Sequence, residues 1–194
     1  RGAIRPQLEV AATARALEEN GAAALSILTE EKYFLGSLAD LTEASFATTL
    51  PCLRKDFIVD EFQIMEAKAY GADAILLIVA AFSAGEDERL AKLGESARHA
   101  GLDVLCEIHN EEELARAVAA GLAQSMIGVN NRNLRNFTVD LGCGKRLGPL
   151  LPQRALRVAE SGIQSAADIK ELKNAGYEAF LIGELLMASE DPGA

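Results

Sequence analysis

The chain has 194 residues, of which 49% are hydrophobic and 25% are charged, a composition typical of one globular domain. Lys and Arg total 19 against 29 Asp and Glu, so the net charge is -10. This acidity argues against a nucleic acid or an anionic membrane as the main partner, although a locally basic pocket can still bind a small anion. No apolar run approaches the roughly 18 residues that cross a membrane, and the N-terminal residues do not resemble a signal peptide.

The few cysteines and histidines argue against a metal site. Cys52, Cys106 and Cys143 have neither CxxC nor zinc-finger spacing, so we predict three reduced thiols in a cytoplasmic protein. Only His99 and His109 are present, and we expect His99 on a helix surface and His109 in a loop. We therefore expect no bound metal.

One structural unit recurs along the chain: a helical stretch ends in Gly, and a short apolar strand follows. Glycine suits the helix stop because the residue there often adopts a left-handed conformation. Pro6 can open the first helix, and three pairs spaced three residues apart predict later helix starts: Ser83 with Glu86, Asn110 with Glu113, and Ser165 with Asp168. In chain order the expected strands are residues 23–28, 52–57, 74–79, 103–108, 125–130, 156–161 and 179–183.

The strands are continuous apolar runs, which is typical of parallel strands covered on both faces. Alternation of such strands with helices predicts an α/β fold with a parallel sheet. No GxGxxG or Walker-type motif marks an open nucleotide-binding sheet. The pattern therefore favours a (β/α)8 TIM barrel, formed as a single domain over residues 1–194.

Polar residues follow the apolar runs at the C-terminal strand ends, where such barrels place their chemistry. Lys55 is a candidate proton donor there, because desolvation lowers the pKa of a lysine; the alternative is a solvated lysine beside Asp56. Glu107 is a candidate general base, and the alternative is a structural salt bridge.

Two glycine-containing turns close the last strands, at Ser161-Gly162 and at Gly183-Glu184. Loops after the last two strands of such barrels commonly bind phosphate through backbone N–H groups. Ordinary tight turns remain the alternative interpretation.

Several segments together resemble the indole-3-glycerol-phosphate synthase family over essentially the whole chain. The Arg-Lys-Asp-Phe and Gly-Val-Asn-Asn-Arg-Asn-Leu runs, in this order, are the most specific. The segments are Ser26–Glu30, Gly36–Leu38, Leu53–Asp60, Leu76–Val79, Glu107–His109, Ile127–Leu134, Ala159–Ile163, Leu181–Glu184 and Leu186–Met187.

The resemblance implies a carbon–carbon lyase of tryptophan biosynthesis that uses no metal or organic cofactor. It would convert 1-(2-carboxyphenylamino)-1-deoxyribulose 5-phosphate to indole-3-glycerol phosphate, with loss of CO2 and water. The implied partner is thus a phosphorylated small molecule, with no nucleic acid and no membrane.

The resemblance also implies roles for individual residues. Lys55 falls on the family's general acid, Glu107 on its general base and Asn130 on the asparagine that orients this base. The remaining implied site residues are Ser161 beside the substrate, backbone donors to phosphate at Gly162, Gly183 and Glu184, apolar walls for the aromatic ring at Phe34, Phe57 and Leu77, and a loop support at Arg132.

The sequence departs from the family pattern at both ends. The family's first strand carries an Ala-Glu-x-Lys segment with no counterpart here, so we expect strands two to eight of the barrel, without the last outer helix. Two open strand edges would invite self-association. We expect this chain alone to show little or no synthase activity. Leu185 stands where relatives often have Ser.

Two other functions remain as alternatives. A phosphate-binding barrel such as phosphoribosylanthranilate isomerase would need a catalytic Cys/Asp pair at strand ends, which the Lys55, Glu107 and Asn130 set does not supply. The second alternative is an inactive barrel fragment that acts as an assembly module.

Overall fold

A computed structural model describes residues 8–134, 136–189 and 192. The chain divides into two compact units, each described by itself. The first unit comprises Arg1–Leu76, Ser96–Asp103 and Glu184–Ala194, and the second comprises Leu77–Glu95 and Val104–Gly183. Pro6, the predicted start of the first helix, lies outside the described residues.

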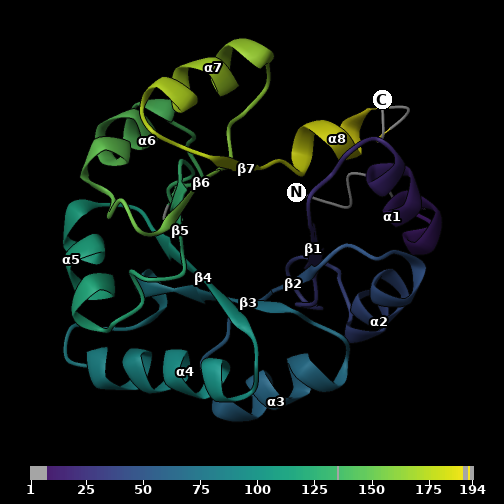
Figure 1. Cartoon of the computed structure of the whole chain (residues 1–194), viewed down its shortest axis with the longest axis horizontal. Helices are drawn as coiled ribbons and strands as arrows, with labels where there is room; N and C mark the ends of the chain where they lie inside the picture. Colours follow the sequence, from purple (N-terminus) through teal and green to yellow (C-terminus); the bar gives the residue numbers. More distant parts are fainter. Residues whose placement is uncertain (1–7, 135, 190–191, 193–194) are drawn as a thin grey trace. The chain divides into compact units, whose positions relative to one another are not determined.

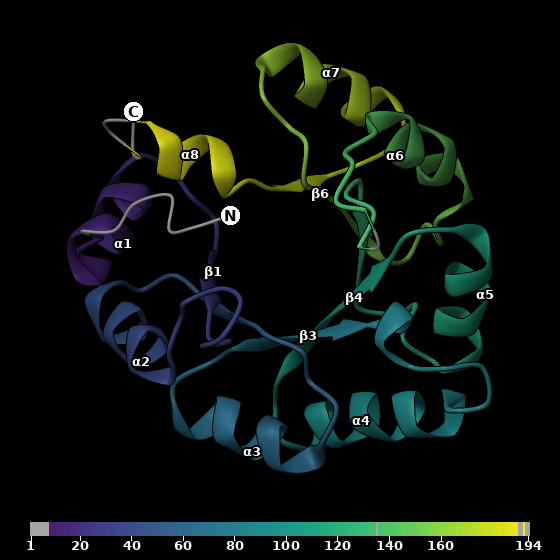
Figure 2. The same ribbon diagram turned by 180° about the vertical axis from the view of Figure 1, so that it is seen from behind.

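Strands and helices alternate along the whole described chain (Figure 1; the reverse side is drawn in Figure 2). The strands are β1 (Leu25–Leu28), β2 (Cys52–Lys55), β3 (Ala74–Ile78), β4 (Asp103–Ile108), β5 (Met126–Asn130), β6 (Leu156–Glu160) and β7 (Ala179–Leu181). The helices are α1 (Val10–Glu19), α2 (Leu38–Ala47), α3 (Glu61–Ala69), α4 (Asp87–His99), α5 (Glu111–Ala119), α6 (Leu141–Leu147), α7 (Ala166–Asn174) and α8 (Glu184–Ala188), with 3-10 turns at Val79–Ala81 and Gly148–Leu150.

The strand order in the sheet is sequential, β1-β2-β3-β4-β5-β6-β7. Within the first unit β1 pairs with β2, and β2 pairs with β3, both in parallel. Within the second unit the parallel ladder runs from β4 through β5 and β6 to β7. Sequential parallel strands joined by helices are the (β/α) repeats of a TIM barrel, so the predicted fold class is confirmed, with seven of eight strands in the described chain.

All seven predicted strands form. Four of them end earlier than predicted, those expected over 52–57, 74–79, 156–161 and 179–183, and two begin later, those expected over 23–28 and 125–130. The strand expected over 52–57 stops at Lys55, and the carboxylate of the next residue, Asp56, accepts hydrogen bonds from Thr29, Arg54 and the Phe57 N–H. The strand expected over 156–161 stops at Glu160, because Ser161 turns the chain with a φ of 63°.

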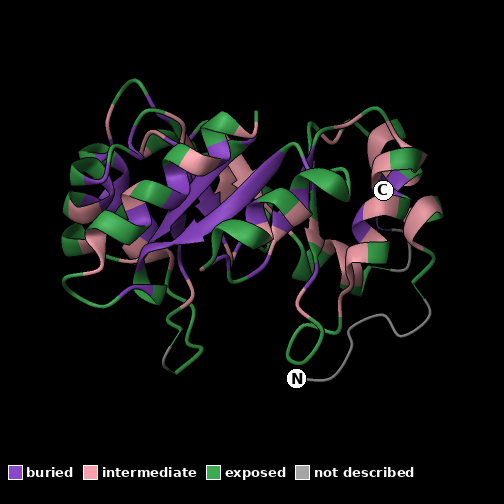
Figure 3. Ribbon diagram, turned by 90° about the horizontal axis from the view of Figure 1, so that it is seen from below, coloured by how far each residue is buried: buried purple, intermediate pink, exposed green. Residues whose placement is uncertain are grey.

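The buried core lies in the strands, whose five-residue run in β3 is buried throughout. Figure 3 shows buried residues concentrated on strands and inward helix faces, with exposed residues on the outer helix surfaces. The five helix-stop glycines all have positive φ, from 68° to 102°, as predicted: Gly21, Gly71, Gly101, Gly121 and Gly176.

Two of the three predicted capping pairs start helices. The side chain of Asn110 accepts from the Glu113 N–H at α5, and the side chain of Ser165 accepts from the Asp168 N–H at α7. Ser83 does bond to Glu86, but α4 begins at Asp87, so this pair lies ahead of the helix rather than capping it. Among the described residues, no helix has both the length and the apolar character needed to cross a membrane.

Candidate functional site

Polar and charged side chains are buried at the C-terminal strand ends. In the described chain they are Thr29, Arg54, Asp56, Glu107, Asn130, Asn131 and Glu160. Burial of such groups is costly unless they are hydrogen-bonded or paired, so each unit has candidate site residues at the C-terminal ends of its own strands. The two units contribute separately: Phe34, Phe57, Lys55 and Glu184 belong to the first, and the other predicted site residues belong to the second.

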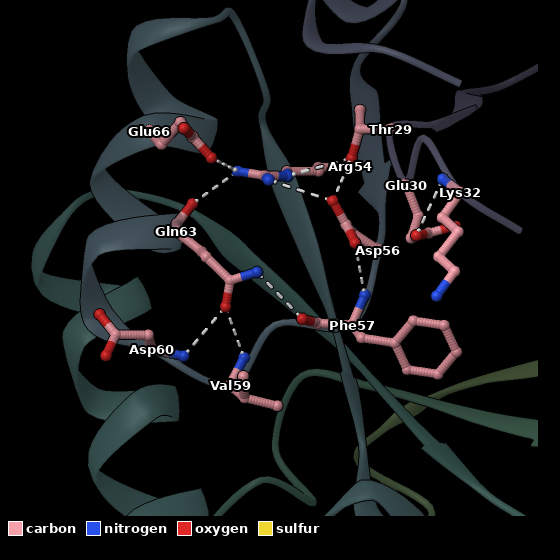
Figure 4. A network of polar contacts seen from close by, with 10 residues as sticks. All are labelled: Thr29, Glu30, Lys32, Arg54, Asp56, Phe57, Val59, Asp60, Gln63 and Glu66. Atoms are coloured by element: carbon pink, nitrogen blue, oxygen red, sulfur yellow. Dashed lines mark hydrogen bonds and ion pairs between the residues drawn. The ribbon is translucent and has the colours of Figure 1, made fainter. Parts of the chain in front are cut away.

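In the first unit, half-buried Lys55 is the last residue of β2, beside the fully packed Arg54. Because successive strand side chains point to opposite faces, Arg54 points to the face opposite Lys55. Its guanidinium bonds to Thr29 Oγ1 at 3.1 Å, to Asp56 Oδ2 at 3.1 Å and to Glu66 Oε2 at 2.8 Å (Figure 4). A buried arginine neutralised by two carboxylates holds the β2 terminus in place.

Asp56 is therefore part of the Arg54 cluster. Its Oδ2 also accepts from the Thr29 hydroxyl at 2.6 Å, and its Oδ1 accepts from the Phe57 N–H at 2.8 Å. No local pattern in the sequence predicts the role of Arg54, since its partners Thr29 and Glu66 are far from it along the chain.

Two predicted ring-binding residues of the first unit lie together. The rings of Phe34 and Phe57 are stacked, with centroids 5.9 Å apart and planes 11° apart. Phe34 is 43% exposed and Phe57 is 37% exposed, so this aromatic pair lines the surface instead of filling the core. Leu77, the third predicted apolar wall, lies in the second unit and is fully buried in β3.

In the second unit, Glu107 lies one residue before the end of β4 and is 1% exposed. Its Oε1 is 3.4 Å from Nε2 of His109, whose Nδ1 is 3.0 Å from Oε2 of Glu113. Burial by itself would lower the pKa of His109, but hydrogen bonds to Glu107 and Glu113 and their charges raise it to about 9. His109 lies in the loop after β4, as expected, and it also joins two carboxylates; the Glu113 four residues onward was the signal for these contacts.

Asn130 and Glu160 are the last residues of neighbouring strands and lie opposite each other in the β5–β6 register. Asn130 is 7% exposed, and its Oδ1 accepts from the Arg132 N–H at 2.9 Å. Glu160 is 1% exposed, and a Cβ added to Gly128 would lie 1.9 Å from its Oε1, so Gly128 makes room for this carboxylate. Arg132 forms an isolated antiparallel bridge with Val139 in the loop after β5.

The predicted Ser161-Gly162 turn has left-handed φ values at both residues, 63° and 80°. Left-handed backbone is unusual for a non-glycine residue and needs support from its surroundings. Asn131 gives that support, since its Nδ2 donates to Glu160 O at 3.0 Å and to Ser161 O at 3.1 Å. Glycine suits this position because its φ of 80° strains other residues, and a Cβ would also lie 2.4 Å from Val139 Cγ1.

The second predicted phosphate turn is more open. A Cβ added to Gly183 would meet nothing within 4 Å, and Glu184 is exposed at the first residue of α8. Among the residues that the structure describes, no group of three or more His, Cys, Asp or Glu side chains is placed to hold a metal ion.

Comparison with known proteins gives a consistent result. The family model described as "Indole-3-glycerol phosphate synthase" matches residues 1–194. A curated relative of that name from Koribacter versatilis (strain Ellin345) is 55% identical over 194 residues, covering 100% of this chain and 73% of the relative. Another from Campylobacter jejuni subsp. doylei is 46% identical over 193 residues, with the same two coverages.

Solved structures with low sequence identity share the fold. Thiamine phosphate pyrophosphorylase from Pyrococcus furiosus superposes with a TM-score of 0.69 at 18% identity, over 96% of this chain and 85% of that one. A mandelate oxidase superposes with a TM-score of 0.68 at 20% identity, over 97% of this chain and 64% of that one. These likenesses concern the fold alone, whereas the family model and the curated relatives agree over the full length: the chain belongs to the indole-3-glycerol phosphate synthase family.

Proposed function

We propose that the protein converts 1-(2-carboxyphenylamino)-1-deoxyribulose 5-phosphate to indole-3-glycerol phosphate, with release of CO2 and water. Family membership makes it a carbon–carbon lyase of tryptophan biosynthesis. The comparisons do not favour the isomerase or the assembly-module alternative. The observation that carries the proposal is the buried Glu107 and Asn130 at the C-terminal ends of the paired strands β4 and β5.

Lys55 acts as the general acid in this proposal. Ring closure joins the ring carbon that bears the carboxylate to the ketone carbon, while the ketone oxygen takes a proton and becomes a hydroxyl. An ammonium group stabilises the negative charge that develops on that oxygen and supplies the proton. The half-buried position of Lys55, held beside the Arg54 cluster, supports this role.

Loss of CO2 and then of water completes the reaction. Ring closure leaves an iminium that accepts the electron pair of the breaking carbon–carboxylate bond. Lys55, which gave up its proton in ring closure, regains one from solvent and passes it to the new hydroxyl, which leaves as water. Glu107 takes a proton from the ring carbon beside nitrogen, which restores aromaticity. Asn130 hydrogen-bonds the substrate and orients Glu107, and Ser161 lies beside the substrate.

The two ends of the substrate are held by different groups. Backbone N–H groups at Gly162, Gly183 and Glu184 bind the phosphate, and the left-handed turn at Ser161-Gly162 supports this assignment. Phe34, Phe57 and Leu77 contact the aromatic ring, and Arg132 supports the loop after β5. Fixing both ends bends the flexible ribulose chain toward ring closure.

Binding and single-turnover chemistry test the proposal. Calorimetry should show binding of the deoxyribulose phosphate and not of phosphoribosylanthranilate, the isomerase substrate. Reactions with protein in excess, followed by indole fluorescence, detect even the slow conversion that we expect of residues 1–194 alone.

Matched variants test the two reacting groups. Lys55→Met and Glu107→Gln should lower the rate about 10²- to 10⁴-fold, the usual contribution of general acid–base catalysis. Lys170→Met and Glu112→Gln, which remove the same charges at exposed positions, should leave the rate unchanged. Preferred binding of phosphoribosylanthranilate, or equal rates in the Lys55 and Lys170 variants, would contradict the proposal.

A further inference from the structure

The aromatic pair Phe34–Phe57 lies on two loops of the first unit, and neither ring is buried. Phe34 belongs to the loop after β1, and Phe57 belongs to the loop after β2. Stacking of two rings contributes only about 0.5 to 1.5 kcal/mol beyond the area that it buries. Stacking by itself is therefore a weak restraint on two surface loops, and other contacts must fix the positions of the rings.

The carboxylate of Glu30 fixes the first loop. Its Oε1 accepts from the Lys32 N–H at 3.1 Å, and its Oε2 accepts from the N–H groups of Tyr33 at 2.5 Å and Phe34 at 3.1 Å. Burial would raise the pKa of Glu30, but the hydrogen bonds from these three N–H groups lower it, so the side chain is held as a carboxylate. One side chain thus sets the backbone up to and including the ring-bearing Phe34.

The loop closes tightly behind Phe34. Gly36 donates its N–H to the Glu30 carbonyl at 3.0 Å, and a Cβ at this position would lie 2.0 Å from the Leu28 carbonyl oxygen. Leu35 has a φ of 57°, so the turn needs external support. The hydrogen bonds to Glu30 supply it.

The amide of Gln63 fixes the second loop from helix α3. Its Oε1 accepts from the N–H groups of Val59 at 2.8 Å and Asp60 at 3.0 Å, and its Nε2 donates to the Phe57 carbonyl at 3.0 Å (Figure 4). The Phe57 N–H is bound by Asp56 at 2.8 Å. Both backbone polar groups of Phe57 are therefore held by side chains.

We propose that Glu30 and Gln63 are positioning residues that pre-form the Phe34–Phe57 pair as the binding surface for the aromatic ring of the substrate. This inference rests on the proposed function, which gives the pair its ligand. Each residue acts through the backbone of the loop that carries one ring. Pre-formation lowers the entropy that binding must spend on ordering these loops.

Comparing the binding of two ligands distinguishes a specific loss of loop positioning from a general loss of structure. The dissociation constants of the deoxyribulose phosphate and of inorganic phosphate are measured by calorimetry. Glu30→Leu and Gln63→Met remove the hydrogen bonds at similar volume, and each should weaken binding of the full substrate about tenfold, equivalent to about 1.4 kcal/mol of binding free energy. Binding of inorganic phosphate should change by less than about twofold.

Conservative and neighbouring variants complete the test. Glu30→Gln and Gln63→Glu keep an acceptor oxygen for the loop N–H groups. They should therefore bind the substrate more tightly than Glu30→Leu and Gln63→Met do. Glu31→Gln in the same loop and Met65→Ala on the same helix, both exposed in the wild type, should behave like the wild type.

The outcomes distinguish this inference from the proposed function. If Phe57→Ala weakens substrate binding while Glu30→Leu and Gln63→Met do not, the positioning role is overturned and the ring-binding role stands. Equal weakening of both ligands would also overturn it, because that indicates a general structural defect. If Phe57→Ala itself leaves substrate binding unchanged, the assigned role of the aromatic pair in the proposed function fails.

Discussion

Asn131 offers the sharpest test of how the second unit is held together. The residue is 3% exposed and lies just after β5. Its Nδ2 donates to the carbonyls of Glu160 and Ser161, and its Oδ1 accepts from the Gly144 N–H at 2.9 Å. The side chain thus connects the ends of β5 and β6 with helix α6, and Asn131→Ala removes all of these contacts.

The expected loss follows from the hydrogen bonds. Each net hydrogen bond contributes about 1 kcal/mol, and a buried N–H left without a partner costs about 1 to 3 kcal/mol. Three lost bonds and an unsatisfied Gly144 N–H, partly relieved by relaxation, predict a loss of about 3 to 4 kcal/mol. This is a large part of the 5 to 15 kcal/mol by which a domain is typically stable.

Urea unfolding followed by circular dichroism measures this loss. The unfolding midpoint should fall while the slope stays constant, because the surface exposed on unfolding is nearly the same. Asn174→Ala, an exposed asparagine at the end of α7, is the matched control and should change stability by less than about 0.5 kcal/mol. A loss below about 1 kcal/mol for Asn131→Ala would refute the reasoning.

Three further predictions follow from the local geometry. The folded-state pKa of His109 is about 9, above its unfolded value of about 6.5, so its ion pairs stabilise the fold fully below about pH 6.5 and lose this effect as pH rises through about 9. His109→Gln should therefore destabilise the protein most near pH 6. A difference in urea midpoint that does not change with pH would contradict this. Gly36→Ala should cost about 1 to 3 kcal/mol, since its Cβ would overlap the Leu28 carbonyl oxygen, and an unchanged melting temperature would disprove the predicted clash. Iodoacetamide should label half-buried Cys143 before the two fully buried cysteines, whose thiol pKa values burial raises to about 11 and about 12; equal labelling rates by mass spectrometry would count against that burial.

The sequence predicts the strand pattern well because apolar runs and helix-stop glycines are local signals. The strand over 103–108 matches β4 at both ends. The strands over 52–57 and 156–161 end before Asp56 and Ser161, and the left-handed turn at Ser161 is a feature that no apolar pattern encodes. Capping pairs are also local, yet the Asp60–Gln63 box at α3 was not predicted, because Gln is a less conspicuous partner than Glu.

The supporting contacts of the site were harder to predict than the polar strand ends. The burial of Arg54 depends on Thr29, 25 residues earlier, and on Glu66 in the following helix, and neither spacing indicates a contact by itself. The interpretation of Glu107 as part of a salt bridge is compatible with its His109 contact, while its role as a base stays a prediction. The single-domain assignment, the self-association and the cytoplasmic location likewise stay predictions.

Two adjacent asparagines, Asn130 at the end of β5 and Asn131 directly after it, have different consequences for anyone who redesigns this protein. Asn131 bonds to three backbone groups and is committed to the scaffold, whereas Asn130, whose side chain faces the opposite side, is the residue that we propose to act on the substrate. A mutagenesis library aimed at new substrates should therefore keep Asn131 constant for stability, and should vary Asn130 only where a changed orientation of Glu107 is acceptable. An alanine scan would lose activity at both positions, and only an unfolding measurement would separate the residue proposed to act in the reaction from the residue that holds the scaffold.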